Sequence, residues 1–256
     1  MNLVDTHCHL HPSPLYMKSG EGQVPNVIKN AIQAGVTKMI TVGTDVEDSR
    51  KAIEFARQHE GVFALAGIHP NIDEEQDLDE FEKLLATGHV VGLGDVGLDY
   101  HYEHDKEKQI KLLESLLGLA VKYDFPVSFH VREAFDDFWS VFDSFKGLRG
   151  VLHCYTDDVD NMEKGLERGL YISINGIATF NHEPQLEEVF ARLPIDRVLL
   201  ETDAPYLAPK PHRGKNNEPA YIRDICEAWA KSHGMAVDEV AEVTTKNAEE
   251  LFGLTG

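Results

Sequence analysis

The sequence has few cysteines and no long apolar run. Only three cysteines occur among 256 residues, and Cys8, Cys154 and Cys226 lack CxxC spacing, which excludes a disulfide framework and a Cys-rich zinc site. We expect them to be small buried side chains. No run of about 18 apolar residues could span a bilayer, and the N-terminus lacks the basic-then-apolar pattern of a signal peptide. These absences predict a cytoplasmic protein with no membrane partner.

Positive charge is also scarce. The sequence has 24 lysines and arginines against 44 aspartates and glutamates, which gives a formal net charge of -20. Such a chain repels polyanions and resists sequence-independent coating of nucleic acid. A nucleic-acid substrate would therefore have to be attracted locally, by a metal site or a small basic patch.

Linkers, low-complexity tracts and solenoid repeats are absent as well. The length and a hydrophobic content of 42% supply ample core for one large domain. We therefore predict a single domain over residues 1–256, and no obligate protein partner is evident.

Eight short apolar or β-branched runs are present, and each is followed by a stretch with helical spacing of apolar residues. In one such stretch Ile110, Leu113, Leu117 and Ala120 fall on one stripe. The eight runs are "NLVDTH", "KMITVG", "VFALAG", "VVGLGD", "PVSFH", "GVLH", "LYISI" and "RVLLET". Strands that are apolar on both faces and joined by helices are parallel. We predict a (β/α)8 TIM barrel, with an open doubly wound sheet as the competing fold.

The first run ends in an unusual pattern, "LVDTHCHLH". A β-strand sends alternate side chains to one face, so Asp5, His7 and His9 point together. Other predicted strand ends also carry imidazole or carboxylate groups, and in a barrel these ends meet at one face. The groups are His69 after the third run, Asp95 at the fourth, His130 at the fifth, His153 at the sixth and Asp203 at the eighth.

Coincidence explains six such ends poorly, whereas neutral imidazole and carboxylate are common metal ligands. We therefore predict a metal centre at the carboxyl ends of the strands. Six histidines lack such placement and are assigned to the solvated surface: His11, His89, His101, His104, His182 and His233. His59 is expected at a helix end, where the helix dipole favours it.

Longer motifs carry a resemblance to the TatD family of metal-dependent nucleases, which are relatives of the amidohydrolase barrels. The motifs are "DTHCHLH", "GIHP", "GDVGLDY", "FHVREA", "LHCY", "YISINGIATF", "LLETDAPYLAP" and "HRGKNNEP", and they extend from residue 3 to about residue 252. The resemblance implies a divalent-metal-dependent DNase, often a 3′ to 5′ exonuclease that prefers single strands. It also implies metal ligation by His7, His9, His130, His153 and Asp203, with the fourth-strand carboxylate bridging two ions.

The fourth-strand carboxylate departs from the family pattern. The family has glutamate where this chain has Asp95, one methylene shorter. If the backbone of a packed barrel resists movement, the shorter side chain holds one ion firmly and a second only weakly. We therefore expect one or two divalent ions, from among Zn, Mn, Mg, Co and Ni.

Further roles follow from position in the predicted barrel. Asp203 is expected both to ligate metal and to act as general base on the nucleophilic water. Pro70 turns the chain away after His69, which is therefore expected to contact the scissile phosphate or the leaving group rather than the metal. Glu201 and Asp5 lie two residues before proposed ligands and are expected to hold imidazoles in the required tautomer.

Substrate contacts are expected from the few cations near the same face. Arg132 could grip a phosphate, although a salt bridge to neighbouring acidic residues is an equal alternative. The loop "APKPHRGKNNEP" concentrates His212, Arg213 and Lys215, with Lys210, in a chain short of positive charge, and we expect it to hold a nucleotide chain. Tyr100 and Tyr206 lie nearby, where aromatic rings either stack on bases or pack.

Three classes of function remain open. The favoured one is a metal-dependent phosphodiesterase, a 3′–5′ exodeoxyribonuclease acting on single-stranded DNA or possibly RNA. The alternative is an amide or ester hydrolase of the amidohydrolase type, although many of those enzymes use a bridging carbamylated lysine and "VVGLGD" contains none. A non-catalytic metal-binding module is least favoured, because structural zinc sites are usually closed and Cys-rich.

Overall fold

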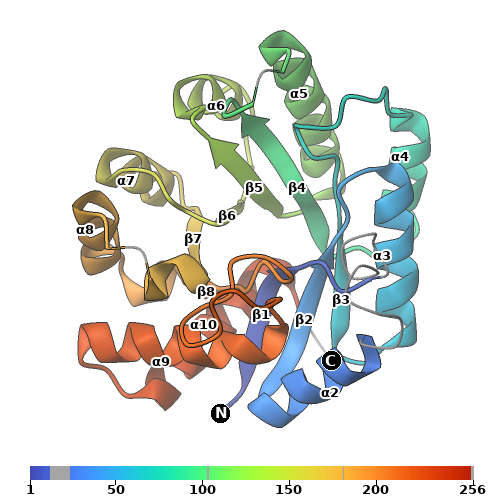
Figure 1. Cartoon of the computed structure of the whole chain (residues 1–256). Helices are drawn as coiled ribbons and strands as arrows, with labels where there is room; N and C mark the ends of the chain where they lie inside the picture. The colour runs from blue at the N-terminus through green and yellow to red at the C-terminus, as the bar shows by residue number, and fades with distance from the viewer. Residues whose placement is uncertain (12–23, 103, 181, 255–256) are drawn as a thin grey trace.

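The strands form one parallel sheet of eight (Figure 1). The computed structural model describes residues 1–11, 24–102, 104–180 and 182–254. The strands are β1 (Leu3–Cys8), β2 (Val36–Val42), β3 (Val62–Ala66), β4 (Gly92–Asp99), β5 (Val127–Arg132), β6 (Gly150–Leu152), β7 (Tyr171–Ile174) and β8 (Val198–Leu200). Each strand pairs with the next along the chain. All eight predicted strands are therefore present, in the order that a barrel requires.

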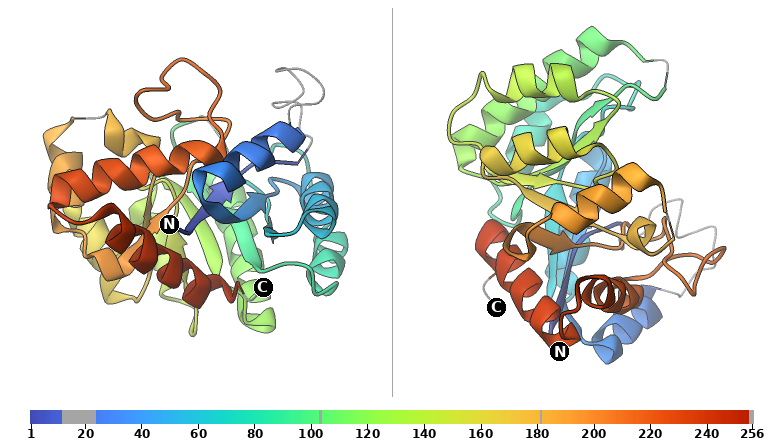
Figure 2. Two further views of the ribbon diagram at one scale, coloured as in Figure 1. Left: turned by 90° about the horizontal axis from the view of Figure 1, so that it is seen from below. Right: turned by 90° about the vertical axis from the view of Figure 1, so that its left-hand side faces the viewer.

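Helices surround the strands, as Figures 1 and 2 show. They are α2 (Val24–Ala34), α3 (Val46–Gln58), α4 (Leu78–Leu85), α5 (Lys106–Tyr123), α6 (Phe135–Phe142), α7 (Val159–Glu167), α8 (Pro184–Arg192), α9 (Ile222–His233) and α10 (Val237–Phe252). Three short 3₁₀ turns are η1 (Gly176–Thr179), η2 (Ile195–Arg197) and η3 (Pro219–Tyr221). Among the described residues, no helix is both long enough and apolar enough to cross a membrane.

The first and last strands meet and nearly close the sheet into a barrel. Cys8 and Ala204 form a parallel bridge. The amide of Asp203 donates to the carbonyl of His7 over 2.8 Å, and the amide of His9 donates to the carbonyl of Ala204 over 2.8 Å. The closure therefore joins the two segments that carry the predicted ligands of the first and eighth strands.

Burial follows the predicted periodicity. On α5, Leu113, Leu117 and Ala120 are buried, and Ile110 packs half-buried against the core. Between the sheet and the helices, fully buried Phe129 of β5 packs against Phe138 and Phe142 of α6, with ring centroids 5.2 Å and 5.7 Å apart. This packed core fixes the strands, and therefore the side chains at their carboxyl ends.

Several aspartates outside the centre begin helices. Each accepts a hydrogen bond at its side chain from an amide three residues later, an interaction that contributes about 1 kcal/mol. These N-cap residues are Asp45, Asp77, Asp105 and Asp158. Part of the excess of acidic residues thus stabilises the N-termini of helices.

Candidate metal centre

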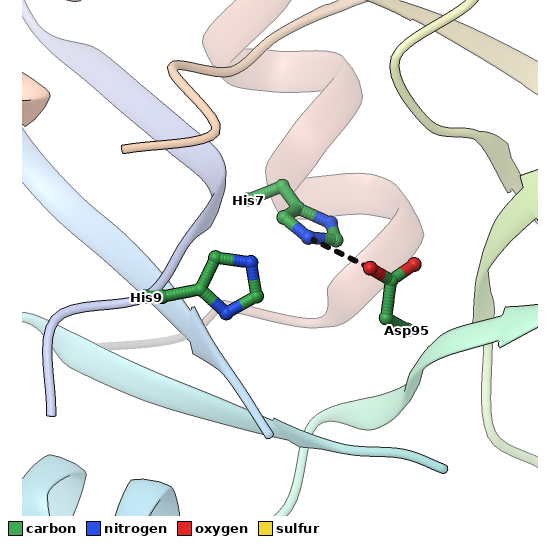
Figure 3. Close-up of side chains that lie close together, drawn as sticks. All are labelled: His7, His9 and Asp95. Carbon is green, nitrogen blue, oxygen red and sulfur yellow. Dashed lines mark ion pairs between the residues drawn. The ribbon is translucent and has the colours of Figure 1, made fainter. Parts of the chain in front are cut away.

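Polar side chains from five strands meet at one end of the barrel. The predicted ligands are His7 in β1, His9 just after β1, Asp95 in β4, His130 in β5, His153 directly after β6 and Asp203 after β8. Figure 3 shows His7, His9 and Asp95 facing a shared space. Their potential ligand atoms fall into overlapping groups that could each hold an ion.

Asp95 lies at the middle of this cluster. Its Oδ2 is 3.8 Å from Nε2 of His7 and 3.9 Å from Nε2 of His69. Its Oδ1 is 3.8 Å from Nδ1 of His130 and 3.9 Å from Nε2 of His153. These separations exceed hydrogen-bond lengths, whereas two ligands of one tetrahedral ion lie about 3.4 Å apart. Each carboxylate oxygen therefore faces a pair of imidazoles across a gap of the size that a cation needs.

Asp203 reaches the same cluster from the segment after β8, which pairs with the end of β1. Its Oδ1 lies 3.6 Å from Nε2 of His9. Its backbone has a left-handed φ of 55°, and its amide is held by the carbonyl of His7. His7 also stacks on His153, with ring centroids 3.7 Å apart. The ends of β1, β6 and β8 are thereby fixed against one another.

The outward nitrogens of the imidazoles are held by hydrogen bonds. Nδ1 of His9 donates to the carbonyl of Val42 over 2.9 Å. Nδ1 of His153 donates to Glu201 over 3.1 Å, and Nε2 of His130 donates to Asp99 over 3.2 Å. Because a carbonyl or carboxylate only accepts, the neutral form of each ring keeps its proton on the outer nitrogen and presents a lone pair inward.

Glu201 is a buried connection point beneath His153. Besides that imidazole, its carboxylate accepts hydrogen bonds from Ser173 Oγ at 2.6 Å, the amide of Cys154 at 2.8 Å and Asn175 Nδ2 at 3.1 Å. Burial alone disfavours a charged His153, but the carboxylates of Glu201 and Asp95 outweigh burial and raise its pKa to about 10. The carboxylates here are therefore arranged to attract positive charge. The predicted role of Glu201 in orienting an imidazole matches this arrangement.

Asp5 does not hold an imidazole as predicted. It is fully buried, and it accepts from Thr202 Oγ1 at 2.5 Å, from the amide of Thr202 at 2.9 Å and from the amide of His7 at 3.4 Å. The imidazole of His7 is instead 3.1 Å from Ser128 Oγ. Asp5 thus fixes the backbone of β1 against the segment after β8, because its side chain is too short to reach past the strand.

The sequence predicts Asp95 at the end of the fourth strand. In the structure, Asp95 lies inside β4 instead. The pairing of β4 with β5 shifts register between Leu93 and Val96. A Cβ placed on neighbouring Gly67 would lie 2.2 Å from the carbonyl carbon of Gly94, so glycine is required for this close approach. The strand is therefore irregular at the point where Asp95 enters the cluster.

Two buried atoms of the cluster have no hydrogen-bond partner. Among the described residues, four buried side-chain nitrogen or oxygen atoms are unpartnered. His7 Nε2 and Asp95 Oδ1 are two of them, and a third, Asn71 Oδ1, lies on the same cavity. An unpaired buried polar group costs about 1–3 kcal/mol, which coordination to a cation would remove. The donor set, four imidazoles and two carboxylates, fits a divalent transition metal.

His69 is held differently from the other imidazoles. Its Nδ1 accepts a hydrogen bond from the amide of Asn71 over 3.1 Å, so the neutral ring carries its proton on Nε2. Burial lowers the pKa of His69 to about 4. A neutral ring with Nε2–H directed at the cluster is a hydrogen-bond donor, in keeping with the predicted contact to phosphate or leaving group.

A cavity of about 980 Å³ opens over the cluster. His9, His69, Asp95, His130, His153 and Asp203 all line it. Arg132 lines it too and is exposed, and its guanidinium lies 5.7 Å from the ring centre of Tyr102. The alternative predicted for Arg132, a salt bridge with a neighbouring acid, is not found among the described residues. Its contact with phosphate remains a prediction.

The basic loop lies apart from the cavity. Among the described residues, the cavity lining includes neither His212, Arg213 nor Lys215. The ring of His212 stacks on Tyr221 with centroids 3.6 Å apart, and its Nε2 lies 3.2 Å from Asp224. Arg213 lies over Phe180, 3.7 Å from the ring centre, while Lys215 is exposed. His212 and Arg213, two of the predicted substrate contacts, thus contact other side chains of the protein.

The prediction of a solvated surface position is wrong for His11, and it holds only in part for His104 and His233, which are both half-buried. His11 is fully buried, not solvated, because its two ring nitrogens bond Thr41 Oγ1 and Asp48 Oδ1, each at 2.9 Å. His233 is half-buried and stacks on Trp229 with centroids 4.0 Å apart. Among the cysteines, Cys8 and Cys226 are buried as expected, but Cys154 is only half-buried and lines the cavity.

A family model described as "TatD related DNase" matches residues 4–253. This chain belongs to the TatD family. It is 38% identical over 258 residues to the metal-dependent hydrolase YcfH of Escherichia coli K12, covering 98% of this chain and 96% of that protein. It is also 34% identical over 241 residues to a protein of Citrobacter rodentium named 3′-5′ ssDNA/RNA exonuclease TatD, covering 90% of this chain and 91% of that protein.

A solved structure supports the same TatD assignment. The crystal structure of YjjV, a TatD homologue from Escherichia coli K12, has a TM-score of 0.90 and 27% identity, and the match covers 99% of this chain and 98% of that one. The fold is therefore the TIM barrel of the TatD family. The chain is accordingly a metal-dependent hydrolase of that family.

The sequence prediction missed two residues of this TatD cavity, Asp99 and Asn71. Asp99 is buried and accepts from His130 and, over 2.8 Å, from Asn71 Nδ2. The period of two residues along β4 places Asp99 on the same face as Asp95, which is a signal that could have identified it. Asn71 lies in a loop, where no periodicity predicts the direction of a side chain.

Proposed function

We propose that the protein is a metal-dependent phosphodiesterase that hydrolyses nucleic acid, and specifically a 3′–5′ exodeoxyribonuclease acting on single-stranded DNA. One observation carries the proposal. Oδ1 of Asp95 faces His130 and His153, and Oδ2 faces His7, at 3.8–3.9 Å, beside an open cavity. Two cations bridged by a carboxylate suit an in-line displacement at phosphorus. Relatives named ssDNA/RNA exonuclease are 34% and 35% identical to this chain.

In this proposal the predicted ligands hold the ions. His7, His9 and Asp203 would hold one ion and His130 and His153 the other, and Asp95 would contribute to both sites. When bound, such ions lower the pKa of water and neutralise charge on the phosphate. Two bound divalent ions would bring about +4 against about -2 from Asp95 and Asp203. This excess provides the local attraction that a chain of net charge -20 otherwise lacks.

The side chains supply the proton transfers. Asp203 accepts a proton from the attacking water, whose oxygen bonds to phosphorus as the bond to the leaving alkoxide breaks. Nε2–H of His69 donates a hydrogen bond to the phosphate or to the leaving oxygen, which takes up a proton from solvent. Arg132 holds a neighbouring phosphate at the cavity rim.

The amide or ester hydrolase has less support. In that class a bridging carbamylated lysine is common, whereas the fourth strand here contributes Asp95 and no lysine occurs in "VVGLGD". The more distant structural neighbours that include deaminases are only 14% identical to this chain, and they bear on the fold alone.

The test is hydrolysis of end-labelled single strands. Protein loaded with Mn²⁺, Zn²⁺ or Mg²⁺ is incubated with 5′-labelled and 3′-labelled DNA and RNA of the same sequence. We expect a ladder that shortens from the 3′ end, faster with DNA. An N-acyl amino acid and a simple ester serve as competing substrates. Hydrolysis of either of these without cleavage of any oligonucleotide would refute the proposal.

A further inference from the structure

Two exposed tyrosines border the cavity. Among the described residues, the large hydrophobic side chains that are exposed are Met1, Ile32, Tyr102, Val121 and Tyr206. Tyr102 and Tyr206 both line the cavity, and they are 52% and 43% exposed. An exposed aromatic ring gains little from the fold, so a pair at one cavity points to a ligand.

Tyr206 is mounted on a rigid turn. Its amide donates to the carbonyl of Asp203 over 2.8 Å. Its carbonyl accepts a 2.6 Å hydrogen bond from Nδ2 of Asn217, a buried side chain that also donates to the carbonyl of Thr202 over 2.7 Å. The ring lies edge-on to that of His9, with centroids 6.3 Å apart. The backbone is thus fixed beside the metal centre while the ring stays open to solvent.

Tyr102 lies on the opposite side of the cavity. It follows β4, whereas Tyr206 follows β8, and in a barrel of eight consecutive strands these two strands are diametrically opposed. Arg132 stands beside it, with the guanidinium 5.7 Å from the ring centre. Five other arginines are paired with carboxylates: Arg50, Arg149, Arg168, Arg192 and Arg223. Within the described part of the chain, Arg132 has no such ion pair.

We propose that Tyr206 and Tyr102 are stacking surfaces for the two nucleobases that flank the scissile phosphate. This inference rests on the proposed nuclease function and specifies its substrate as a single-stranded polynucleotide. The phosphate lies over Asp95, Arg132 holds the adjoining phosphate, and one base stacks on each ring. Bases in a duplex are already stacked and paired, so only unpaired bases can lie on both tyrosines. The two rings therefore account for a single-strand preference without reading sequence.

The test combines tyrosine variants with abasic substrates. Kinetics are measured with metal-loaded wild type, Tyr206→Leu and Tyr102→Leu on a single-stranded oligonucleotide, and on the same oligonucleotide without the two bases at the cleavage site. Ile32→Ala is the matched control, because Ile32 is 61% exposed and does not line the cavity. Circular dichroism melting checks that each variant is folded.

We expect each leucine variant to raise KM for the intact oligonucleotide about tenfold. Removing both bases removes both stacks and should raise KM for wild type about a hundredfold. On the abasic substrate the leucine variants should then show the same KM as wild type. Tyr206→Phe should restore the KM that leucine loses. If wild type cleaves DNA and both leucine variants keep its KM, the stacking inference is wrong while the nuclease proposal stands. If wild type cleaves no oligonucleotide, the proposed function itself fails.

Discussion

The metal cluster and the basic loop differ in how their side chains are held. In the cluster, the histidine ligands stand on or next to strands, and the outer nitrogens of three of them are fixed by buried partners, Val42, Asp99 and Glu201. In the loop after β8, His212 and Arg213 lie against Tyr221 and Phe180. Similar residue types thus have different roles in the two regions. The register of a strand determines where its side chains point, whereas the sequence of a loop does not.

Removing the metal or one of its ligands should have the largest effect. We expect chelation, His130→Ala or His153→Ala to reduce hydrolysis to background, because each removes part of one cluster. Hydrolysis assays with and without added metal measure this. His182→Ala, at an exposed surface histidine, should retain full activity. Full activity in metal-free protein would show that the cluster is not a metal centre required for hydrolysis.

A substitution at Asp99 tests how much the hydrogen-bond partner of a ligand contributes to metal affinity. Asp99→Ala leaves Nε2 of His130 without its acceptor, and we expect metal affinity to fall about 10- to 100-fold. Isothermal titration with Zn²⁺ or Mn²⁺ measures the change. Asp79→Asn, at an exposed aspartate of α4, is the control. Unaltered affinity in Asp99→Ala would mean that the fold alone orients His130.

The geometry of Asp95 revises the prediction that one metal ion binds firmly and a second only weakly. That prediction assumed a regular strand, whereas the register of β4 shifts beside Asp95 and brings its oxygens within 3.9 Å of four imidazoles. We therefore expect wild type to bind two ions with similar affinity. Asp95→Glu should weaken binding roughly tenfold, because an added methylene overpacks a filled site. A higher metal stoichiometry in Asp95→Glu would instead support one firm and one weak site.

The rim cations should give the smallest effects. Arg132→Ala should raise KM for an oligonucleotide about tenfold, because a charge-assisted contact with phosphate is lost. Arg213→Ala and Lys215→Ala should change KM less than about twofold, since both side chains lie off the cavity. Steady-state kinetics at fixed ionic strength compare the three. A larger loss from the loop variants would show that the loop moves over the substrate.

Most of the centre could be predicted because it depends on alternation along strands. His7, His130 and His153 follow directly from strand ends, and Asp99 would have followed from the same alternation. What failed depends on contacts between distant segments. The burial of His11 requires Thr41 and Asp48, and the irregular backbone at Asp95 packs against Gly67, which directly follows β3. No local pattern in the sequence reports such pairings.

The junction between β1 and β8 has a consequence for biosynthesis. Asp5 bonds Thr202, a partner 197 residues away, and the amide of Asp203 bonds the carbonyl of His7. Such distant pairings form late, because a long loop must close before they gain any energy. A ribosome-bound chain therefore displays His7 and His9 for most of its synthesis without the segment that completes their environment. The metal centre is therefore complete only after β8 has left the ribosome.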